Sequence, residues 1–437
     1  GDILTLDSEQ RVLSSTDLLL ERGLITAIGP NLDIEGPVHS LDVSGCWILP
    51  GLIQGHVHLG QTFFRGLAEG RRLLPWLRER IWPLEAAHDD ESAYWCALLG
   101  AAECLLSGTS TIQDIGLGPG AAGLLEAISD SGLRAQAGMC LLDGGEGMPE
   151  ALFAETDRVL ETTLELGERF DGSAAGRLRY LLNPRFVLSC SDALWQGIEA
   201  MSRSKDWPIH THALEQEEET EVDRSMKQGR DEIEYFDQMG ILASDVRIAH
   251  GVWLTQSHLS RVQSRRFSVV HCPSTNLKLG SGIADIVGIR QAGVPVGVGS
   301  DGAPCNNELD AFKELRLAAQ LQHLKHGPDC FSGREALCLA TCEGAKALGL
   351  DAEIGSVEEG KAADILVMDR ACPEFFAASI VDPHDLIAFG GSRRAVRHLF
   401  VAGRQLVAEG ELTRLDLRQI QAQAASCLES LLRRARI

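Results

Sequence analysis

Residues 48–58 read ILPGLIQGHVH, an apolar run that ends in two histidines. A short apolar run bounded by turn residues predicts a buried strand, which we place at Ile48–Val57. Side chains two positions apart on a strand point to the same face, so the rings of His56 and His58 can reach one point beyond its carboxyl end. Imidazole is the commonest metal ligand among side chains. The stretch therefore predicts a strand that presents two metal-capable groups.

Three more apolar runs end in the same way further along the chain. His210 and His212 close one run with Glu215 just behind them, His250 closes the next, and Asp301 follows the last. Four such endings in order, each between a strand and a helix, predict a single site at one end of a parallel barrel. Strand parity cannot choose between His210 and His212. The acidic run 215–223 is by itself typical of a solvated helix face.

The middle of the chain alternates predicted strands with predicted helices, which favours right-handed crossovers and a parallel sheet. The predicted strands are Ile48–Val57, Thr109–Ile115, Leu133–Leu142, Arg177–Asn183, Pro208–Ala213, Val246–His250, Phe267–His271 and Val294–Ser300. Helices are predicted, among others, at 91–107, 150–168, 191–204 and 215–238. Eight such units predict an α/β protein with a (β/α)₈ TIM barrel, whose active site lies at the carboxyl ends of the strands. We assign this catalytic barrel domain to residues 50–354.

The two ends of the chain read differently from the middle. Short strands separated by glycine-containing turns are predicted near both ends, including a hairpin formed by 17–20 and 24–29. We expect residues 1–49 and 355–437 to form one small β-sandwich domain. Leucines and arginines at helical spacing predict a terminal amphipathic helix at 415–436. The opening residues already read as a strand, so we expect a few residues upstream of them.

Composition narrows the class of protein. The 437 residues carry a net charge of −22 and are 44% hydrophobic, which makes nucleic acid and anionic membranes poor partners. We find no apolar run long enough for a bilayer and no secretory signal. The 12 cysteines contain no Cys-x-x-Cys spacing, which predicts reduced thiols and a cytoplasmic location. A homodimer or higher homo-oligomer is the default expectation for a soluble enzyme of this kind.

The nitrogen and oxygen groups at the strand ends suit Zn²⁺ or Fe²⁺ rather than Ca²⁺ or Mg²⁺. Three imidazoles and one carboxylate leave room for a water, whose pKa a divalent metal lowers from 15.7 to about 7. A two-metal site often uses a carboxylated lysine on the fourth strand, but Lys205 is the only lysine between positions 111 and 210. We therefore predict one divalent metal, with zinc first and iron second.

At these residues the chain resembles the amidohydrolase superfamily over nearly its whole length. The motifs that carry the resemblance are LPGLI at 49–53 before the His-x-His, HCPSTNLKLGSG at 271–282, SDGAPCNN at 300–307 and IGSVEEGKAAD at 354–364. The resemblance implies that the metal ligands are His56, His58, His212 and Asp301. It selects His212 over His210 because Glu215 then stands three residues on. It also implies that Glu215 shuttles a proton to a ring nitrogen, that His250 aligns the water and that Asp301 takes the water's proton.

The substrate signals within this superfamily conflict. FRGLA at 64–68 and IWPLE at 81–85 resemble adenosine-type deaminases, in which a glutamate at the position of Glu85 holds ribose hydroxyls. Gln61 and Arg185 resemble residues that hold the purine edge in guanine deaminases. Adenosine-type enzymes commonly carry a histidine near the position of Arg185, and this chain has none there. Each of two residues also has a purely structural explanation. Glu215 would be an ordinary acidic residue at a helix N-terminus, and Arg185 would form a surface ion pair.

The first hypothesis is a hydrolytic deaminase that removes an exocyclic amine from a small heterocyclic substrate and releases ammonia. Its expected substrate is a 5′-modified adenosine such as methylthioadenosine, S-adenosylhomocysteine or 5′-deoxyadenosine. The alternatives are a guanine, 8-oxoguanine or pterin-type base deaminase and a triazine chlorohydrolase. A catalytically dead barrel used as a scaffold is the alternative from another class. The unrelated zinc nucleobase deaminases need His-x-Glu with Pro-Cys-x-x-Cys, and this pair is absent from the sequence.

Overall fold

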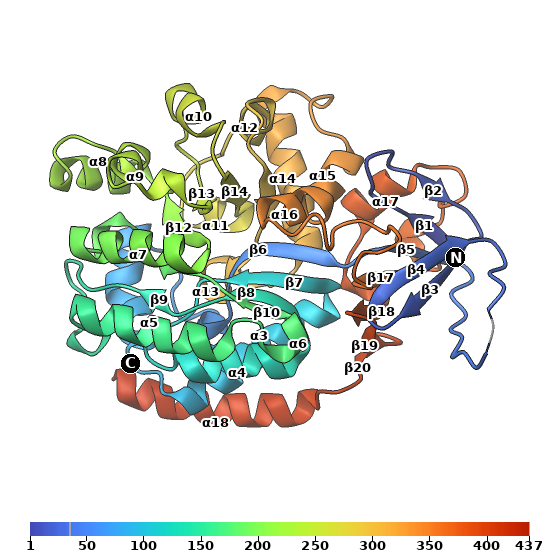
Figure 1. Cartoon of the computed structure of the whole chain (residues 1–437), viewed down its shortest axis with the longest axis horizontal. Coiled ribbons are helices and arrows are strands. Elements are labelled where there is room, and N and C mark those ends of the chain that lie inside the picture. Colours follow the sequence, from blue (N-terminus) through green and yellow to red (C-terminus); the bar gives the residue numbers. More distant parts are fainter. Residues whose placement is uncertain (35, 437) are drawn as a thin grey trace.

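The protein is described by a computed structural model that covers residues 1–34 and 36–436. It is an α/β protein, as the sequence predicts. Figure 1 shows the parallel strands in the middle of the molecule with helices around them, and the strands from both chain ends gathered at one side. Among the described residues, no helix combines the length and apolarity needed to cross a lipid bilayer.

The parallel strands of the middle part pair in a cyclic order. One five-stranded sheet consists of β10 (Leu178–Tyr180), β8 (Arg134–Ala137), β7 (Thr109–Asp114), β6 (Leu52–His58) and β16 (Asp301–Gly302). A four-stranded sheet consists of β12 (Ile209–Ala213), β13 (Val246–His250), β14 (Phe267–His271) and β15 (Val296–Val298). A parallel bridge from Leu182 to Ile209 links the two sheets on one side. On the other side, β16 follows β15 of the second sheet in the chain and pairs with β6 of the first sheet, with Asp301 opposite Val57. All the carboxyl ends therefore point to one side.

Two predicted strands are each split in the structure. The strand predicted at Leu133–Leu142 is β8 followed by the short β9 (Cys140–Leu141), and that at Arg177–Asn183 is β10 followed by β11 (Asn183–Pro184). The short strands β9 and β11 pair with each other in parallel. The chain therefore continues past the sheet and carries Arg185 forward from the strand end.

The prediction of one strand at Ile48–Val57 is wrong, because two strands in different sheets follow each other there. β5 (Cys46–Pro50) pairs with β1 and β17 of the terminal sheet, whereas β6 pairs with β7 and β16. Gly51 joins them, and a Cβ atom at this position would lie 2.4 Å from the Cβ of Ser110. Only glycine lets the backbone pass so close to β7.

Helices follow the strands and cover the outside of the ring. They are α3 (Asp90–Leu106), α4 (Ala121–Ser131), α5 (Thr156–Phe170), α6 (Ser173–Gly176), α7 (Asp192–Lys205), α8 (Glu217–Met226), α9 (Glu232–Gln238), α10 (Gln256–Val262), α11 (Pro273–Lys278), α12 (Ile286–Gln291), α13 (Ala303–Asn306), α14 (Ala311–His326), α15 (Gly333–Leu339) and α16 (Cys342–Ala347). The helix predicted at 215–238 is two helices, α8 and α9. Side-chain caps fix several starts, as where Asp89 accepts the Ser92 N–H and Ser191 the Leu194 N–H.

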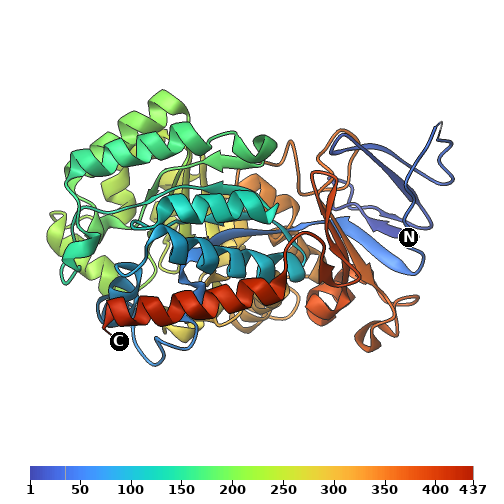
Figure 2. The ribbon, with the colours of Figure 1, turned by 90° about the horizontal axis from the view of Figure 1, so that it is seen from below.

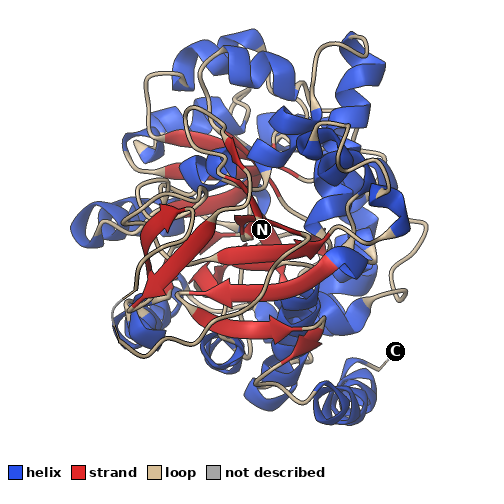
Figure 3. Ribbon diagram, turned by 90° about the vertical axis from the view of Figure 1, so that its right-hand side faces the viewer, coloured by secondary structure: helices blue, strands red, loops and turns tan. Residues whose placement is uncertain are grey.

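Strands from both chain ends share one seven-stranded sheet, which faces the viewer in Figure 3. Its order is β2 (Val12–Leu13), β1 (Asp2–Leu4), β5, β17 (Ile365–Asp369), β18 (Val396–Val401), β19 (Arg404–Ala408) and β20 (Glu411–Leu412). The predicted hairpin is present as β3 (Asp17–Glu21) and β4 (Leu24–Gly29). Its Ile25 shares a buried cluster with Ile48 and Ile365 of the sheet, so the two sheets pack on each other.

The terminal helix α18 (Leu417–Ala435) does not lie on this terminal sheet. It runs along α3, as Figure 2 shows, and buries Ala424, Cys427 and Leu431 in a cluster with Phe63 and Trp82. A short helix α17 (Pro383–Gly390) packs instead against α14 and α15.

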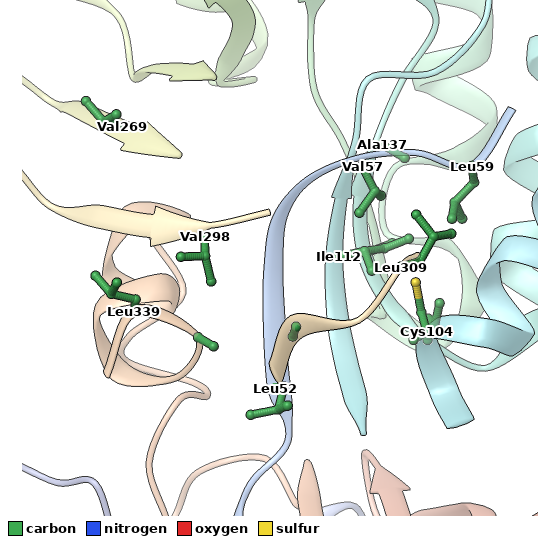
Figure 4. Close-up of a cluster of buried hydrophobic side chains, with 14 of the residues drawn as sticks. Leu52, Val57, Leu59, Cys104, Ile112, Ala137, Val269, Val298, Leu309 and Leu339 are labelled. Carbon is green, nitrogen blue, oxygen red and sulfur yellow. The ribbon is translucent and has the colours of Figure 1, made fainter. Parts of the chain in front are cut away.

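The core of the ring is aliphatic and dense. Figure 4 shows Val57 of β6 beside Ile112 of β7, with Leu309 and Cys104 close by and Val298 of β15 on the other side of β6. These side chains are fully buried. Because close-packed cores resist displacement, strands held in this way fix the directions of the polar residues at their carboxyl ends.

Candidate functional site

The structure brings four predicted ligands, far apart in sequence, to one point. His58 Nε2 lies 3.2 Å from Asp301 Oδ1 and 3.2 Å from His212 Nε2, and His56 Nε2 lies 3.4 Å from the same Asp301 oxygen. His56, His58 and Asp301 are buried, and His212 is partly exposed. His56 and His58 end β6, His212 lies near the end of β12, and Asp301 begins β16. The carboxyl ends of the parallel strands therefore converge on a shared space.

A chain of hydrogen bonds fixes the tautomer of His56. His210 Nδ1 lies 3.0 Å from the carbonyl oxygen of Arg247, which can only accept, so this nitrogen carries the proton. His210 Nε2 is then an acceptor for the N–H at His56 Nδ1, at 2.8 Å. His56 Nε2 is left without a proton, buried, and without a hydrogen-bond partner in the described part of the chain. Such a lone pair is what a metal ligand presents.

His212 is oriented in the same manner. Its Nδ1 donates to the carbonyl oxygen of Arg185 at 2.6 Å, which leaves Nε2 free to face His58. Burial lowers the pKa of His58 and of His212 well below the ordinary value of 6.5, so both rings are neutral. His210, by contrast, turns its Nε2 to His56 rather than to the shared space.

The donor set fits one divalent metal. The side chain of Asp301 is buried, and its Oδ1 faces Nε2 of His56 from 3.4 Å and Nε2 of His58 from 3.2 Å. The site therefore offers a carboxylate and neutral imidazoles. His56, His58 and Asp301 each present a ligand atom within 4.8 Å of one another. This combination suits zinc or iron better than calcium or magnesium.

Glu215 and His250 lie beside this donor set. His250 Nε2 is 3.4 Å from Glu215 Oε2 and 3.9 Å from Asp301 Oδ2, and its Nδ1 is 2.9 Å from Asn276 Oδ1. Burial, reinforced by the charge of Asp301, raises the pKa of Glu215 above its ordinary value of 4.5. Ser281 donates a hydrogen bond to its other oxygen at 3.3 Å. A protonated carboxyl and an oriented imidazole therefore face the same space.

The backbone at two of these positions is in the left-handed region. His250 has a φ of 72° and Asp301 a φ of 61°. Such conformations are uncommon for residues other than glycine, and they gather at functional sites because the surrounding structure holds them. Here they turn the chain at the strand ends and aim both side chains at the shared space.

The three predicted substrate residues form a buried chain of contacts. Arg185 Nη1 donates to Glu85 Oε2 at 2.7 Å, and Gln61 Nε2 lies 2.8 Å from Glu85 Oε1 and 3.1 Å from His58 Nδ1. Arg185 does not form a surface ion pair, because the side chains of Arg185 and Glu85 are only 5% and 4% exposed. Of the three, only Arg185 lines the cavity described next.

A small pocket opens on the donor set. Its lining has a polar part, called here the polar wall, and an apolar part, called the apolar wall. The polar wall consists of His58, Arg185, His212, Glu215, Glu219, His250 and Asp301, and the apolar wall of Leu73, Trp76, Leu77, Phe186 and Leu279. Three of the apolar residues come from α1 (Leu73–Trp76) and the π-helical turn η2 (Leu77–Ile81), which continue into α2 (Trp82–Glu85). The cavity therefore offers a ligand both charge and an apolar surface.

Sequence reasoning missed several of these residues. The apolar wall has no chemical signature, because isolated leucines and tryptophans are ordinary core residues. Asn276 and Ser281 lie inside the quoted motif at 271–282, which was the one available signal for them. The solvated face predicted for 215–223 is wrong at Glu219 and Asp223, which are both 1% exposed. Glu219 accepts the backbone N–H groups of Glu215 and Gln216, so it caps the turn that carries Glu215.

Comparisons with known proteins agree with this geometry. The model of the amidohydrolase family matches residues 47–406. A 5-methylthioadenosine/S-adenosylhomocysteine deaminase of Halobacterium salinarum is 35% identical over 97% of this chain and 95% of its own length. A 5′-deoxyadenosine deaminase of Methanobrevibacter smithii is 32% identical over 95% and 93% of the two chains. The crystal structure of an adenosine deaminase from Xanthomonas campestris with bound zinc superimposes with a TM-score of 0.91 at 27% identity and covers 99% of this chain and 97% of its own.

Proposed function

The chain belongs to the amidohydrolase family, and we propose that it is a metal-dependent hydrolytic deaminase of 5′-modified adenosine nucleosides. The observation that carries this proposal is the convergence of His56, His58, His212 and Asp301 on one space, with Glu215 and His250 beside it. The names of the similar proteins, which are deaminases of 5′-modified adenosines, support the same reaction.

The four converging residues would hold one divalent ion, for which zinc is our first choice and iron the second. When bound, such a metal supplies the Lewis acidity that lowers the pKa of a water from 15.7 to about 7. The unprotonated nitrogen of His56 and the carboxyl oxygen of Asp301 that faces it support this assignment. The zinc in the Xanthomonas structure also supports it.

Side chains around the cavity supply the proton transfers. Glu215, protonated because of its burial, delivers a proton to the ring nitrogen next to the carbon that bears the exocyclic amine. His250 orients the attacking water through Nε2, and Asp301 accepts one proton of that water and passes it to the leaving amine. The water's second proton returns to Glu215 as the oxo group forms. The products are the oxo-substituted ring and ammonia. Positioned acids and bases of this kind contribute typically 10²- to 10⁴-fold each.

Two features of the cavity bear on the substrate. The apolar wall formed by Trp76, Leu77 and Leu279 favours a substrate that carries an apolar group beyond its polar ring. Arg185, held by Glu85, favours a substrate that also carries hydrogen-bond acceptors. A 5′-alkylthio or 5′-deoxy nucleoside meets both requirements.

A second candidate function is deamination of a free base such as guanine, 8-oxoguanine or a pterin. The observation that favours it is Arg185, whose guanidinium lines the cavity where it could face a ring carbonyl. A triazine chlorohydrolase is a third possibility, since the same acidic and metal-binding groups can activate water against other leaving groups. A catalytically dead scaffold conflicts with the complete donor set.

A substrate panel tests these alternatives. The purified protein is incubated with methylthioadenosine, S-adenosylhomocysteine, 5′-deoxyadenosine, guanine, 8-oxoguanine, a pterin and a chlorotriazine, and ammonia or chloride is measured. We expect ammonia from the nucleosides, loss of activity after chelation and its return with zinc. Ammonia from guanine alone would favour the second candidate. No release from any compound would refute the substrate assignment.

The cyclic order of parallel strands supports a (β/α)₈ barrel as the scaffold, which we assign to residues 50–354. The two packed sheets of the chain ends support a small β-sandwich domain formed by residues 1–49 and 355–437. A homodimer or larger homo-oligomer and a cytoplasmic location remain our predictions from the sequence. Gel filtration with light scattering tests the first, and cell fractionation tests the second.

A further inference from the structure

Glu314 of α14 is a buried carboxylate outside the cavity. Its side chain is completely shielded from solvent. Oε2 accepts the backbone N–H of Ser274 at 3.1 Å, and Oε1 accepts the hydroxyl of Ser274 at 2.6 Å and the Nδ2–H of Asn306 at 2.9 Å. One carboxylate therefore joins two segments that are 32 residues apart, the start of α11 and the end of α13.

The first segment orients His250. Ser274 and Asn276 both belong to α11, the short helix that follows β14. The Oδ1 of Asn276 lies 2.9 Å from Nδ1 of His250 and so fixes which nitrogen of the ring faces Glu215 and Asp301. A shift of the start of α11 would therefore move the imidazole.

The second segment carries Asp301. Asn306 donates through the same Nδ2 to the carbonyl oxygen of Ser300 at 2.7 Å, which is the residue directly before Asp301. Lys313 donates to Asn306 Oδ1 at 3.2 Å, so the orientation of the Asn306 amide is fixed from its other side. A shift of this amide would move the strand end that holds the Asp301 carboxylate.

We propose that Glu314 is a positioning residue that holds the His250 and Asp301 segments in register by accepting hydrogen bonds from Ser274 and Asn306. The inference rests on the proposed function, because it assigns a purpose to the spacing between His250 Nε2 and Asp301 Oδ2, which is 3.9 Å. Glu314 itself does not line the cavity. It acts through its neighbours and not on a substrate.

Glu314→Gln is the sharpest test because it preserves the size of the side chain. All three groups that face the carboxylate are donors, and the amide of glutamine offers only one accepting oxygen. Its NH₂ group must therefore oppose a donor of Ser274 or of Asn306. Asn306 cannot relieve the conflict by turning over, because Ser300 and Lys313 hold its amide in one orientation. Leaving a buried donor unpaired is costly, so the segments must move apart.

The matched control is Glu308→Gln, the same chemical change six residues earlier. The Glu308 side chain is 61% exposed and lies 3.8 Å from Lys313 Nζ. For both variants and the unmodified protein, three quantities are measured: kcat and KM on the nucleoside that the protein deaminates, the zinc dissociation constant by competition with a chelating dye, and the melting temperature.

We expect Glu314→Gln to lower kcat about tenfold or more, to leave KM within about twofold and to weaken zinc binding about tenfold, the range that supporting residues of metal sites typically show. Glu308→Gln should match the unmodified protein. A fall in kcat alone supports the His250 side of the proposal, and weaker zinc binding alone supports the Asp301 side. Unchanged kcat with unchanged zinc affinity overturns it, and so does a raised KM with unchanged kcat.

Two further arrangements keep the test decisive. If Glu314→Gln does not fold, Ser274→Ala removes one of the three donors and leaves none unpaired. A threefold or larger fall in kcat or zinc affinity then supports the proposal, and no change overturns it. If the unmodified protein deaminates no nucleoside, the proposed function fails by itself, and the zinc dissociation constants of the same variants still decide the role of Glu314.

Discussion

His210 Nε2 lies 2.8 Å from His56 Nδ1, although 154 positions separate the two residues in the chain. His210 thus fixes the proton on His56 and leaves the other ring nitrogen of His56 free. We predict that His210→Ala weakens zinc binding by about 10- to 100-fold, because the buried N–H of His56 loses its acceptor and the ring loses its orientation. Competition with a chelating dye measures the effect.

The control for this prediction is His326→Ala, which removes an exposed imidazole that pairs with Asp285 at the end of α14 and does not line the pocket. Its zinc affinity should equal that of the unmodified protein. Equal affinities for His210→Ala and His326→Ala would mean that the orientation of His56 is set by something other than His210.

Glu215→Gln should retain the metal and the fold and lose most turnover. The amide keeps the size of the side chain but cannot deliver a proton to a ring nitrogen, so we expect kcat to fall by about 10²- to 10⁴-fold. Glu218→Gln, a change at an exposed position in the first turn of α8, is the control. Metal analysis and steady-state kinetics on both proteins measure the outcome, and near-normal activity of Glu215→Gln would refute the proton-shuttle role.

Arg185→Ala should affect both substrate binding and stability. We expect KM to rise tenfold or more because a cavity-lining donor is lost, and the free energy of unfolding to fall by about 3 kcal/mol because Glu85 is left buried without its partner. Arg179→Ala removes an ion pair with Glu353 that is about 40% exposed, with values of 40% and 42%, and should cost less than about 1 kcal/mol.

The double variant Arg185→Ala with Glu85→Ala separates the two effects of that change. Removing both charges should restore part of the lost stability, because no lone buried charge remains. KM should stay raised. A double variant with a normal KM would place the specificity contacts elsewhere in the cavity.

Asp223 makes the stability of the protein depend on pH. Burial, together with Glu232 and Glu219, raises the pKa of Asp223 far above its ordinary value of 3.8. Between those two pKa values the folded protein holds a proton that the unfolded chain has released, so the free energy of unfolding falls as pH rises, by about 1.4 kcal/mol per pH unit for one proton. The stabilisation is fully present only below the ordinary pKa.

Asp223→Asn should therefore flatten this dependence and make the protein more stable at pH 8. Urea unfolding between pH 5 and pH 9 measures the slope, which should change by about one proton per molecule. Glu221→Gln on the exposed side of the same helix is the control. Identical slopes for Asp223→Asn and the unmodified protein would show that the proton resides on another member of the cluster.

Much of the site was predictable because each of its polar residues stands at the end of a recognisable strand. The convergence of His56, His58, His212 and Asp301 follows from parallel strands that all end on one side. The sequence pattern alone could not choose between His212 and His210, because residues two positions apart on a strand point to the same face. The resemblance to the family supplied that choice. In the structure His212 faces the shared space, whereas His210 forms a hydrogen bond with His56.

Other features depend on contacts that no local pattern carries. The split of the first predicted strand at Gly51 reflects its crowding against Ser110, a residue 59 positions later. The raised pKa of Asp223 depends in part on Glu232, which lies in another helix. The role of Glu314 depends on two segments that the helix meets only in three dimensions. Pairings of this kind arise from the fold as a whole and leave no periodic trace in the sequence.

The uninterrupted run from β5 to β6 ties the terminal sheet to the catalytic strands without any linker. Gly51 packs closely against Ser110 and the backbone of Asp364, so the two strands cannot move independently at this junction. Unfolding of the terminal sheet would therefore displace β6, the strand that carries His56 and His58. We expect the molecule to melt in one cooperative step, and an isolated fragment that begins at residue 50 would forfeit the anchor of its first strand.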